Sequence, residues 1–253
     1  MKKIIIANWK MNPSSPKEAS KLFSDTAKLL SSIKKTEVIV CAPYVYLSNL
    51  KKLSSKISLG GQNIFTEVGG AYTGEISADM LYNIGVKYVI LGHSERRTMG
   101  ENNLDINKKL KIALRVGLTP ILCVGEDKRN EDHGYFNFVK NELEECLNGV
   151  PRDSLSKIII AYEPIWAISS TSDRKDATTH DSREMAVFIR KTIADKLGDK
   201  NKLPRVIYGG SVNERDADDF IKEGGVDGLL VGRASLDARK FSSIVKICEA
   251  LKK

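Results

Sequence analysis

The sequence predicts an α/β protein, folded as a single (β/α)8 barrel domain over residues 1–253. Short apolar, β-branched runs recur along the whole chain and alternate with segments of helical periodicity. The runs are apolar almost throughout, as is typical of parallel strands that are covered on both faces. Reactive side chains follow many different runs, and the ends of many strands converge only when a sheet closes into a ring.

Eight β-strands are expected, one in each apolar run: residues 4–7, 37–41, 57–60, 88–91, 120–124, 158–162, 205–208 and 228–231. Apolar residues at helical spacing separate them, most clearly in three stripes: Ala19, Leu22, Phe23, Leu30 and Ile33; Phe136, Val139, Leu143, Cys146 and Leu147; and Phe241, Ile244, Val245, Cys248 and Leu251. Parallel strands need such crossover helices. No G-x-G-x-x-G motif follows the first strand, which argues against an open dinucleotide-binding sheet.

Composition and charge exclude several classes of protein, such as nucleic-acid-binding and membrane-spanning proteins. The formal net charge is +8, and basic residues occur in scattered pairs rather than in a stripe interleaved with aromatics, so nucleic-acid binding is not expected. No apolar run approaches the ~20 residues that span a bilayer, so no membrane segment is expected. The start of the chain lacks the features of a signal peptide. The four cysteines show no paired spacing, which predicts reduced thiols in a cytoplasmic protein.

The sixth strand ends in a single carboxylate, Glu163, which is followed by Pro164 and Trp166. A carboxylate at the rim of an apolar strand is well placed to act as a general base. The proline and the large aromatic residue suit a stiff-ended lid that closes over the site and excludes water. The alternative is a structural role for Glu163, as a helix cap or as the partner of a lysine.

Two further polar side chains follow other strands. His93 comes soon after the fourth strand, where a helix is expected to begin, and the N–H groups of a helix N-terminus disfavour an imidazolium ion. A neutral imidazole there could donate a hydrogen bond to a carbonyl oxygen, and a structural cap is the alternative. Lys10 follows the first strand. On the inner rim of a barrel, its charge would hold an anion and balance charge that develops on an oxygen.

Glycine-rich turns follow the last two strands, as Gly209-Gly210-Ser211 and Val231-Gly232-Arg233. Glycine lets backbone amides approach an anion closely, and (β/α)8 barrels often bind phosphate in these two loops. The sequence therefore predicts a phosphate site here, with tight turns that bind no ligand as the alternative.

Ordered motifs along nearly the whole chain, from Ala7 to Leu236, resemble the triosephosphate isomerase family. They are NWKMN at 8–12, GGAYTGEIS at 69–77, LGHSERR at 91–97, CVGE at 123–126, YEPIWAI at 162–168, YGGSV at 208–212 and GVDG at 225–228. The resemblance implies the (β/α)8, or TIM, barrel. It also implies the interconversion of dihydroxyacetone phosphate and D-glyceraldehyde 3-phosphate in glycolysis and gluconeogenesis.

The resemblance implies a role for each reactive residue. Glu163 is the base that moves a proton between adjacent carbons, and His93 is the neutral electrophile that polarises the carbonyl, a pairing that is the established chemistry of that family. Lys10 stabilises the anionic substrate and the enediolate, with Asn8 beside it. Glu95 is a further polar member that hydrogen-bonds towards Lys10. No metal ion and no organic cofactor are implied, because a proton shift needs only a base and an electrophile.

The resemblance also implies a lid, a phosphate site and a partner subunit. The lid would consist of Pro164, Ile165, Trp166, Ala167, Ile168, Ser169, Ser170 and Thr171. Substrate phosphate would be bound by Ser169, Ser211, Gly232 and Arg233. The chain would form a homodimer in which the loop at 69–75 inserts into the neighbouring subunit and brings Thr73 to its site.

Two positions depart from the family pattern. The family's lid continues with Gly-Thr-Gly, whereas here a longer, serine-rich run follows at 169–176 and contains no glycine. Serine adopts φ > 0 less readily than glycine, and a looser lid would let the enediolate lose phosphate. Arg233 occupies the position of the family's second glycine. At positive φ it would cost about 1 kcal/mol or more, whereas at ordinary φ its amide can still bind phosphate. Its guanidinium would point to solvent, pair with Asp173 or Asp176, or reach the phosphate.

Three functions are compatible with the sequence. The first is active triosephosphate isomerisation. The second is a phosphosugar-binding barrel that turns over slowly because its lid is altered, and the third is a non-enzymatic role in which the basic surface binds an acidic partner. The presence of Glu163, His93 and Lys10 together favours the first, because a protein that only binds its ligand has no use for a base.

Overall fold

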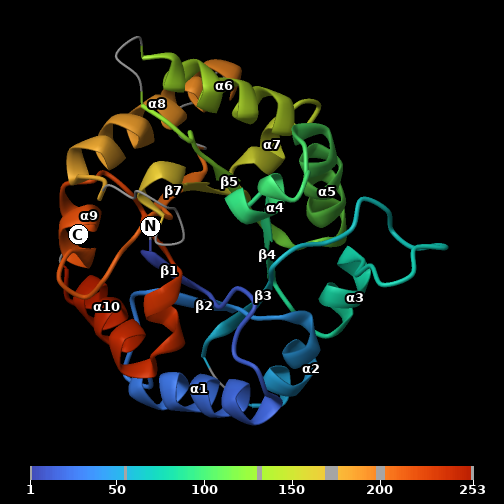
Figure 1. Ribbon diagram of the computed structural model, residues 1–253, viewed down its shortest axis with the longest axis vertical. Coiled ribbons are helices and arrows are strands. Elements are labelled where there is room, and N and C mark those ends of the chain that lie inside the picture. Colours follow the sequence, from blue (N-terminus) through green and yellow to red (C-terminus); the bar gives the residue numbers. More distant parts are fainter. Residues whose placement is uncertain (1, 54–55, 130–132, 169–175, 198–202, 252–253) are drawn as a thin grey trace.

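The structure, a computed structural model, describes residues 2–53, 56–129, 133–168, 176–197 and 203–251. Its parallel strands close into a barrel in the order of the sequence (Figure 1). They are β1 (Ile4–Asn8), β2 (Glu37–Cys41), β3 (Ser58–Gly61), β4 (Tyr88–Leu91), β5 (Thr119–Val124), β6 (Ile159–Tyr162), β7 (Arg205–Tyr208) and β8 (Gly228–Val231). The predicted (β/α)8 fold class and all eight predicted strands are confirmed, with shifts of one residue at some strand ends.

Helices surround the barrel on its outside (Figure 1). They are α1 (Pro16–Leu29), α2 (Tyr44–Lys52), α3 (Ala78–Asn83), α4 (Ser94–Thr98), α5 (Asn103–Val116), α6 (Gly134–Cys146), α7 (Arg152–Leu155), α8 (Thr179–Leu197), α9 (Ala217–Lys222) and α10 (Ala238–Ala250), with the 3-10 turns η1 (Ile165–Ala167) and η3 (Arg233–Leu236). Side-chain caps start several of them. The oxygens of Ser15 and Asn102 accept the N–H groups of Glu18 and Asp105, which satisfies donors that a helix N-terminus leaves open.

The three predicted helical stripes all extend past the end of their helix. α1 ends at Leu29, because Leu30, with φ −104° and ψ 12°, leaves the helical conformation. Leu30 is still buried, and Ile33 packs against the core from the following turn. Apolar periodicity therefore predicted burial correctly but placed the helix end too late.

Alternate residues of each strand pack on opposite faces of the barrel. Ile4 and Ile6 of β1 belong to a cluster that fills the barrel interior, whereas Ile5 and Ala7 pack in the layer between the strands and the helices. Because both faces are covered, the strands are apolar at nearly every position. The packed interior leaves the strand ends as the place for a site.

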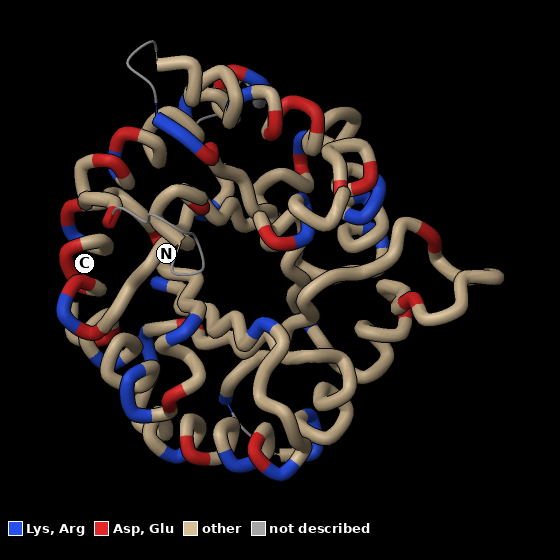
Figure 2. The backbone as a smooth tube through the Cα atoms, viewed as in Figure 1, with Lys and Arg blue, Asp and Glu red and all other residues tan. Residues whose placement is uncertain are grey.

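The described part of the chain contains no helix with the length and apolarity needed to cross a membrane. The four cysteines are free and buried, in agreement with the predicted reduced thiols. Figure 2 shows acidic and basic residues interspersed along the outer helices.

Candidate active site

Lys10 is held at the end of β1 in a backbone conformation that only a few non-glycine residues adopt. Its φ is 53°, a left-handed value that costs on the order of 1 kcal/mol and persists only where the surroundings enforce it. The side-chain oxygen of Asn8 accepts the N–H of Lys10 at 3.0 Å, and Gln62 donates to its carbonyl at 2.8 Å. The ammonium bonds to Oε1 of Glu95 at 2.6 Å. The strained backbone and this ion pair fix the lysine at the cavity.

His93 is positioned by the turn between β4 and α4. Gly92 has φ of 69°, which lets the chain turn sharply so that His93 caps α4. Nδ1 of His93 accepts the backbone N–H of Glu95 at 3.2 Å. Nδ1 therefore carries no proton in this arrangement, and the neutral ring holds its proton on Nε2, which faces the cavity. The side chain is 8% exposed.

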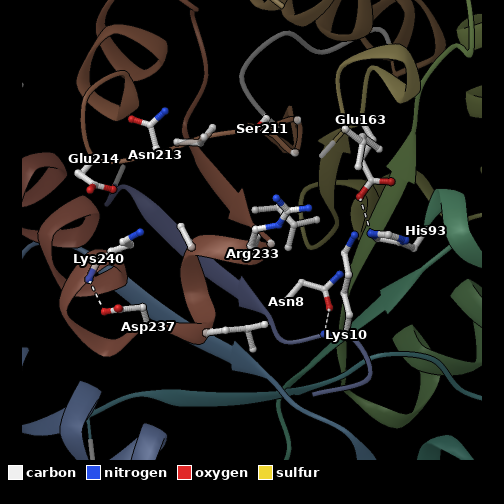
Figure 3. A pocket seen from close by; sticks show the side chains of 18 residues that line it. Asn8, Lys10, His93, Glu163, Ser211, Asn213, Glu214, Arg233, Asp237 and Lys240 are labelled. Carbon is white, nitrogen blue, oxygen red and sulfur yellow. Dashed lines mark hydrogen bonds and ion pairs between the residues drawn. The ribbon is translucent and has the colours of Figure 1, made fainter. Parts of the chain in front are cut away.

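Glu163 follows β6 and is only 2% exposed. Its Oε1 lies 3.3 Å from Nε2 of His93 (Figure 3). Its Oε2 accepts the N–H of Ser94 at 3.2 Å. Burial and the negative charge of Glu163 raise the pKa of the neighbouring Cys123 thiol well above its ordinary value, so this cysteine stays protonated. The carboxylate thus rests between a ring N–H and a helix N-terminus.

These side chains share one cavity of about 350 Å³ at the C-terminal ends of the strands. The cavity is lined by Asn8, Lys10, His93, Glu163, Ser211, Gly232 and Arg233, among other residues. A volume of this size suits a small ligand. Figure 3 shows the Lys10, His93 and Glu163 side chains together on one side of the cavity and Ser211 and Arg233 near its middle.

The two glycine-rich turns form the other part of the cavity wall. A side chain added at Gly232 would meet only Cε of Lys10, at 3.7 Å, so a ligand can approach this backbone closely. Among the described non-glycine residues only Lys10 and His133 have positive φ, so Arg233 adopts an ordinary conformation and carries no such strain. The amide of Ser211 bonds to the carbonyl of Ala167 at 3.4 Å, which connects this turn to the first part of the predicted lid.

The first part of the predicted lid is described, and the rest is not. Pro164 leads into η1, and Trp166 donates its indole N–H to Oε1 of Glu126 at 3.0 Å. Ser169, Ser170 and Thr171, together with Asp173, lie outside the described residues. The segment between β3 and α3 projects from the barrel at the right of Figure 1. Thr73 belongs to this segment and is exposed.

Some residues of the site were not predicted from the sequence. Asn213, Glu214, Asp237 and Lys240 line the far side of the cavity. The first two directly continue the Gly-Gly-Ser turn, so their position in the chain was a usable signal. Lys240 is different, because it lies in the first turn of α10, which Asp237 caps, and nothing in the local pattern marks it as facing a cavity.

Comparisons with known proteins agree with this geometry. A family model described as triosephosphate isomerase matches residues 3–248. The chain belongs to the triosephosphate isomerase family. A triosephosphate isomerase of Thermoanaerobacter pseudethanolicus is 45% identical over 96% of this chain and 98% of its own, and one of Aquifex aeolicus is 41% identical over 97% and 99%. A crystal structure of triosephosphate isomerase from Bartonella henselae has a TM-score of 0.85 and 34% identity, and the match covers 98% of this chain and 99% of that one.

The resemblance that the sequence motifs indicated is therefore confirmed. Several of these motifs contribute side chains to the cavity described above, with NWK at the end of β1, GHSE after β4 and YEP at the end of β6. In the part of the chain that the structure describes, no group of three or more His, Cys, Asp or Glu side chains is arranged to hold a metal ion.

Proposed function

We propose that this isomerase interconverts dihydroxyacetone phosphate and D-glyceraldehyde 3-phosphate by a cofactor-free proton transfer, with Glu163 as the base, His93 as the electrophile and Lys10 as the stabilising cation. The reaction itself, a step of glycolysis and gluconeogenesis, follows from membership of the family. One observation supports the assignment of these three catalytic roles. The Glu163 carboxylate lies 3.3 Å from Nε2 of His93 in the cavity that Lys10 also lines.

Proton transfer begins at the carboxylate of Glu163. It takes a proton from C1 of dihydroxyacetone phosphate, the C–H electrons form a C1–C2 double bond, and the carbonyl electrons move to O2. The proton of the O1 hydroxyl passes to O2, and Glu163 returns its proton to C2 to complete the aldehyde. To reach the substrate, the carboxylate gives up the amide of Ser94, which it contacts at 3.2 Å.

His93 and Lys10 stabilise the negative charge that develops in this step. Nε2 of His93 donates its proton to the substrate oxygens, because the backbone N–H of Glu95 already occupies Nδ1. The ammonium of Lys10 is fixed by Glu95 at 2.6 Å, so little reorganisation accompanies the reaction. Preorganised donors of this kind are worth about a hundredfold to a thousandfold in rate.

The phosphate group of the substrate binds at the two glycine-rich turns. The backbone amides of Gly232 and Arg233 serve as donors, because the backbone at Gly232 leaves room for close approach and Arg233 has an ordinary φ. The amide of Ser211 joins them when it gives up its bond to the carbonyl of Ala167. Ser169 of the lid is proposed as a further donor. The positive charges of Lys10 and Arg233 favour a dianionic phosphate in this cavity.

We also propose that the protein is a cytoplasmic homodimer of single-domain barrels. Met11, Val45 and Met99 are 93%, 79% and 76% exposed, which is unusual for large apolar side chains and suits a subunit interface. The projecting loop carries Tyr72 and Thr73, both exposed. Light scattering after size exclusion should give the mass of two chains. A monomer with full activity would refute the dimer and the proposed role of Thr73.

Replacing the base tests the proposed function directly. Glu163→Gln keeps the size of the side chain and removes the proton acceptor, so the isomerisation kcat should fall about a thousandfold. Glu144→Gln, which removes an exposed carboxylate from the outside of α6, is the matched control and should keep the native rate. A Glu163→Gln variant that retained most of the rate would show that another group is the base.

A further inference from the structure

A second cavity lies at the opposite end of the barrel from the active site. Its volume is about 350 Å³, the same as that of the active-site cavity. The last turn of α2 lines it, together with Ser58, the first residue of β3, and Lys87, the residue before β4. These are strand starts, whereas the reactive side chains follow strand ends. The reaction described above therefore makes no use of this cavity.

The charge around this second cavity is of one sign. Four lysines line its described wall and no aspartate or glutamate does: Lys51, Lys52, Lys56 and Lys87. Among the described residues, no carboxylate lies within ion-pair distance of these four ammonium groups. Other surface lysines are paired, such as Lys21 with Asp25 at 2.6 Å. Cavities that are lined by a single sign of charge concentrate the field and attract ions of the opposite charge.

Two of the four lysines are held in place by backbone carbonyls. Nζ of Lys51 donates to the carbonyl of Gly85 at 3.3 Å, and Nζ of Lys56 donates to the carbonyl of Ser31 at 3.2 Å. An ammonium group has three donors and a full charge. A single bond to a neutral carbonyl therefore leaves both lysines with the charge and the donors to bind an anion.

Lys52 and Lys87 present ammonium groups that the described residues leave unpaired, with neither a hydrogen bond nor an ion pair. The backbone of Lys87 is fixed, because its N–H donates to the carbonyl of Leu59 at 3.0 Å and its carbonyl accepts the N–H of Thr119 at 2.8 Å. Lys52 lies in the last turn of α2 and interacts favourably with the negative end of that helix. Lys87 lies outside any helix, so a helix end does not account for its charge.

We propose that this cavity binds a diphosphate group between its four lysines, an activity that goes beyond the proposed function. At neutral pH a diphosphate carries roughly three negative charges and a single phosphate roughly two, so the diphosphate matches the four positive charges better. Lysine binds phosphate as a point charge, and Ser58 adds a half-buried hydroxyl donor. Phe23 lines the cavity but is 1% exposed, so it offers no face on which a nucleotide base could stack.

Isothermal titration calorimetry with inorganic pyrophosphate, in the absence of divalent cations, tests the proposal. The native protein should bind pyrophosphate in this cavity in addition to any that binds at the active site. In Lys52→Gln/Lys87→Gln the affinity of this cavity should fall at least about tenfold, because two of its four charges are lost. The competitive inhibition of isomerisation by pyrophosphate, which reports the active site alone, should not change.

The matched control removes the same net charge elsewhere. Lys17→Gln/Lys108→Gln replaces two exposed lysines of α1 and α5 that do not line the cavity, and it should keep the native titration. An unchanged titration in Lys52→Gln/Lys87→Gln would overturn the proposal. An equal loss of affinity in both double variants would also overturn it, because net charge alone would then explain the binding. The calorimetric result does not depend on isomerase activity, so it stands or falls separately from the proposed function.

Two further titrations identify the ligand. Inorganic phosphate should bind in this cavity at least about tenfold more weakly than pyrophosphate, and equal affinities would overturn the match with two phosphoryl groups. Affinities that are equal for ADP and pyrophosphate would assign the diphosphate group of a larger molecule. Binding of pyrophosphate without ADP would assign the free ion. Both of these last results support the proposal.

Discussion

Glu142 is a buried carboxyl group of α6 that packs behind the active site. It is 4% exposed, its Oε2 accepts the N–H of Gly125 at 2.8 Å, and its Oε1 lies 3.1 Å from Arg97. Burial raises the pKa of Glu142 to about 7, although the guanidinium of Arg97 and the N–H of Gly125 both favour the charged form. The stability of the protein should therefore depend on the titration of this one group.

The stability of the protein depends on pH because Glu142 has a different pKa in the folded and in the unfolded chain. The folded protein keeps the proton on Glu142 up to about pH 7, whereas the unfolded chain releases it near its ordinary pKa of 4.5. Between these values the folded state binds more protons, so stability is fully present below about pH 4.5 and is lost as the pH rises through 7. Each unit of pKa corresponds to about 1.4 kcal/mol, so the loss is roughly 3 kcal/mol.

Glu142→Gln removes this titration and keeps the shape of the side chain. The free energy of unfolding, measured by urea denaturation from about pH 5 to about pH 8, should fall by up to roughly 3 kcal/mol in the native protein and should lack this decline in the variant. All other ionisable groups are shared, so the difference between the two profiles isolates Glu142. Parallel profiles would refute the reasoning and would mean that Arg97 keeps Glu142 charged throughout.

Two further predictions concern the walls of the site. A side chain at Gly125 would lie 1.9 Å from the carbonyl oxygen of Glu163, so Gly125→Ala should destabilise the protein by about 3 kcal/mol or more and lower kcat by displacing the base, as measured by denaturation and isomerase assay. Arg233→Gly removes a positive charge from the cavity, so the KM for glyceraldehyde 3-phosphate should rise about threefold to tenfold. An unchanged KM and kcat would show that the guanidinium of Arg233 has no part in binding.

Much of the fold could be predicted from the sequence because the strands carry a continuous apolar signal. Strands such as β4 and β8 are covered on both faces, and no polar residue interrupts them. The bounds of short helices such as α7 and α9 were not predicted, because they are too short to show a clear helical period, whereas the start of α4 was expected at His93. Helix ends depended on caps and turns, such as the one at Leu30, that apolar spacing does not reveal.

The site residues that belong to a sequence motif could be predicted. Those that meet only through contacts between distant parts of the chain could not. Glu163, His93 and Lys10 each follow a strand, so closure of the barrel brings them together. Gln62 and Lys10 are 52 positions apart in the chain, and only the pairing of β1, β2 and β3 makes them partners. The sequence did not determine the φ of Arg233, since a positive and a negative value were both compatible with the turn. The structure gives Arg233 an ordinary, negative φ.

We expect this chain to be an active isomerase whose serine-rich lid protects the enediolate, which otherwise loses phosphate and forms methylglyoxal. The most direct test is the isomerisation rate of the purified native protein with glyceraldehyde 3-phosphate, with methylglyoxal assayed in the same sample. We expect a kcat of at least about 100 per second, in the upper part of the usual range for enzymes, and little methylglyoxal. Slow turnover, or methylglyoxal formed in proportion to the isomerised product, would contradict the claim, because the base, electrophile and cation would then act without a sealed cavity.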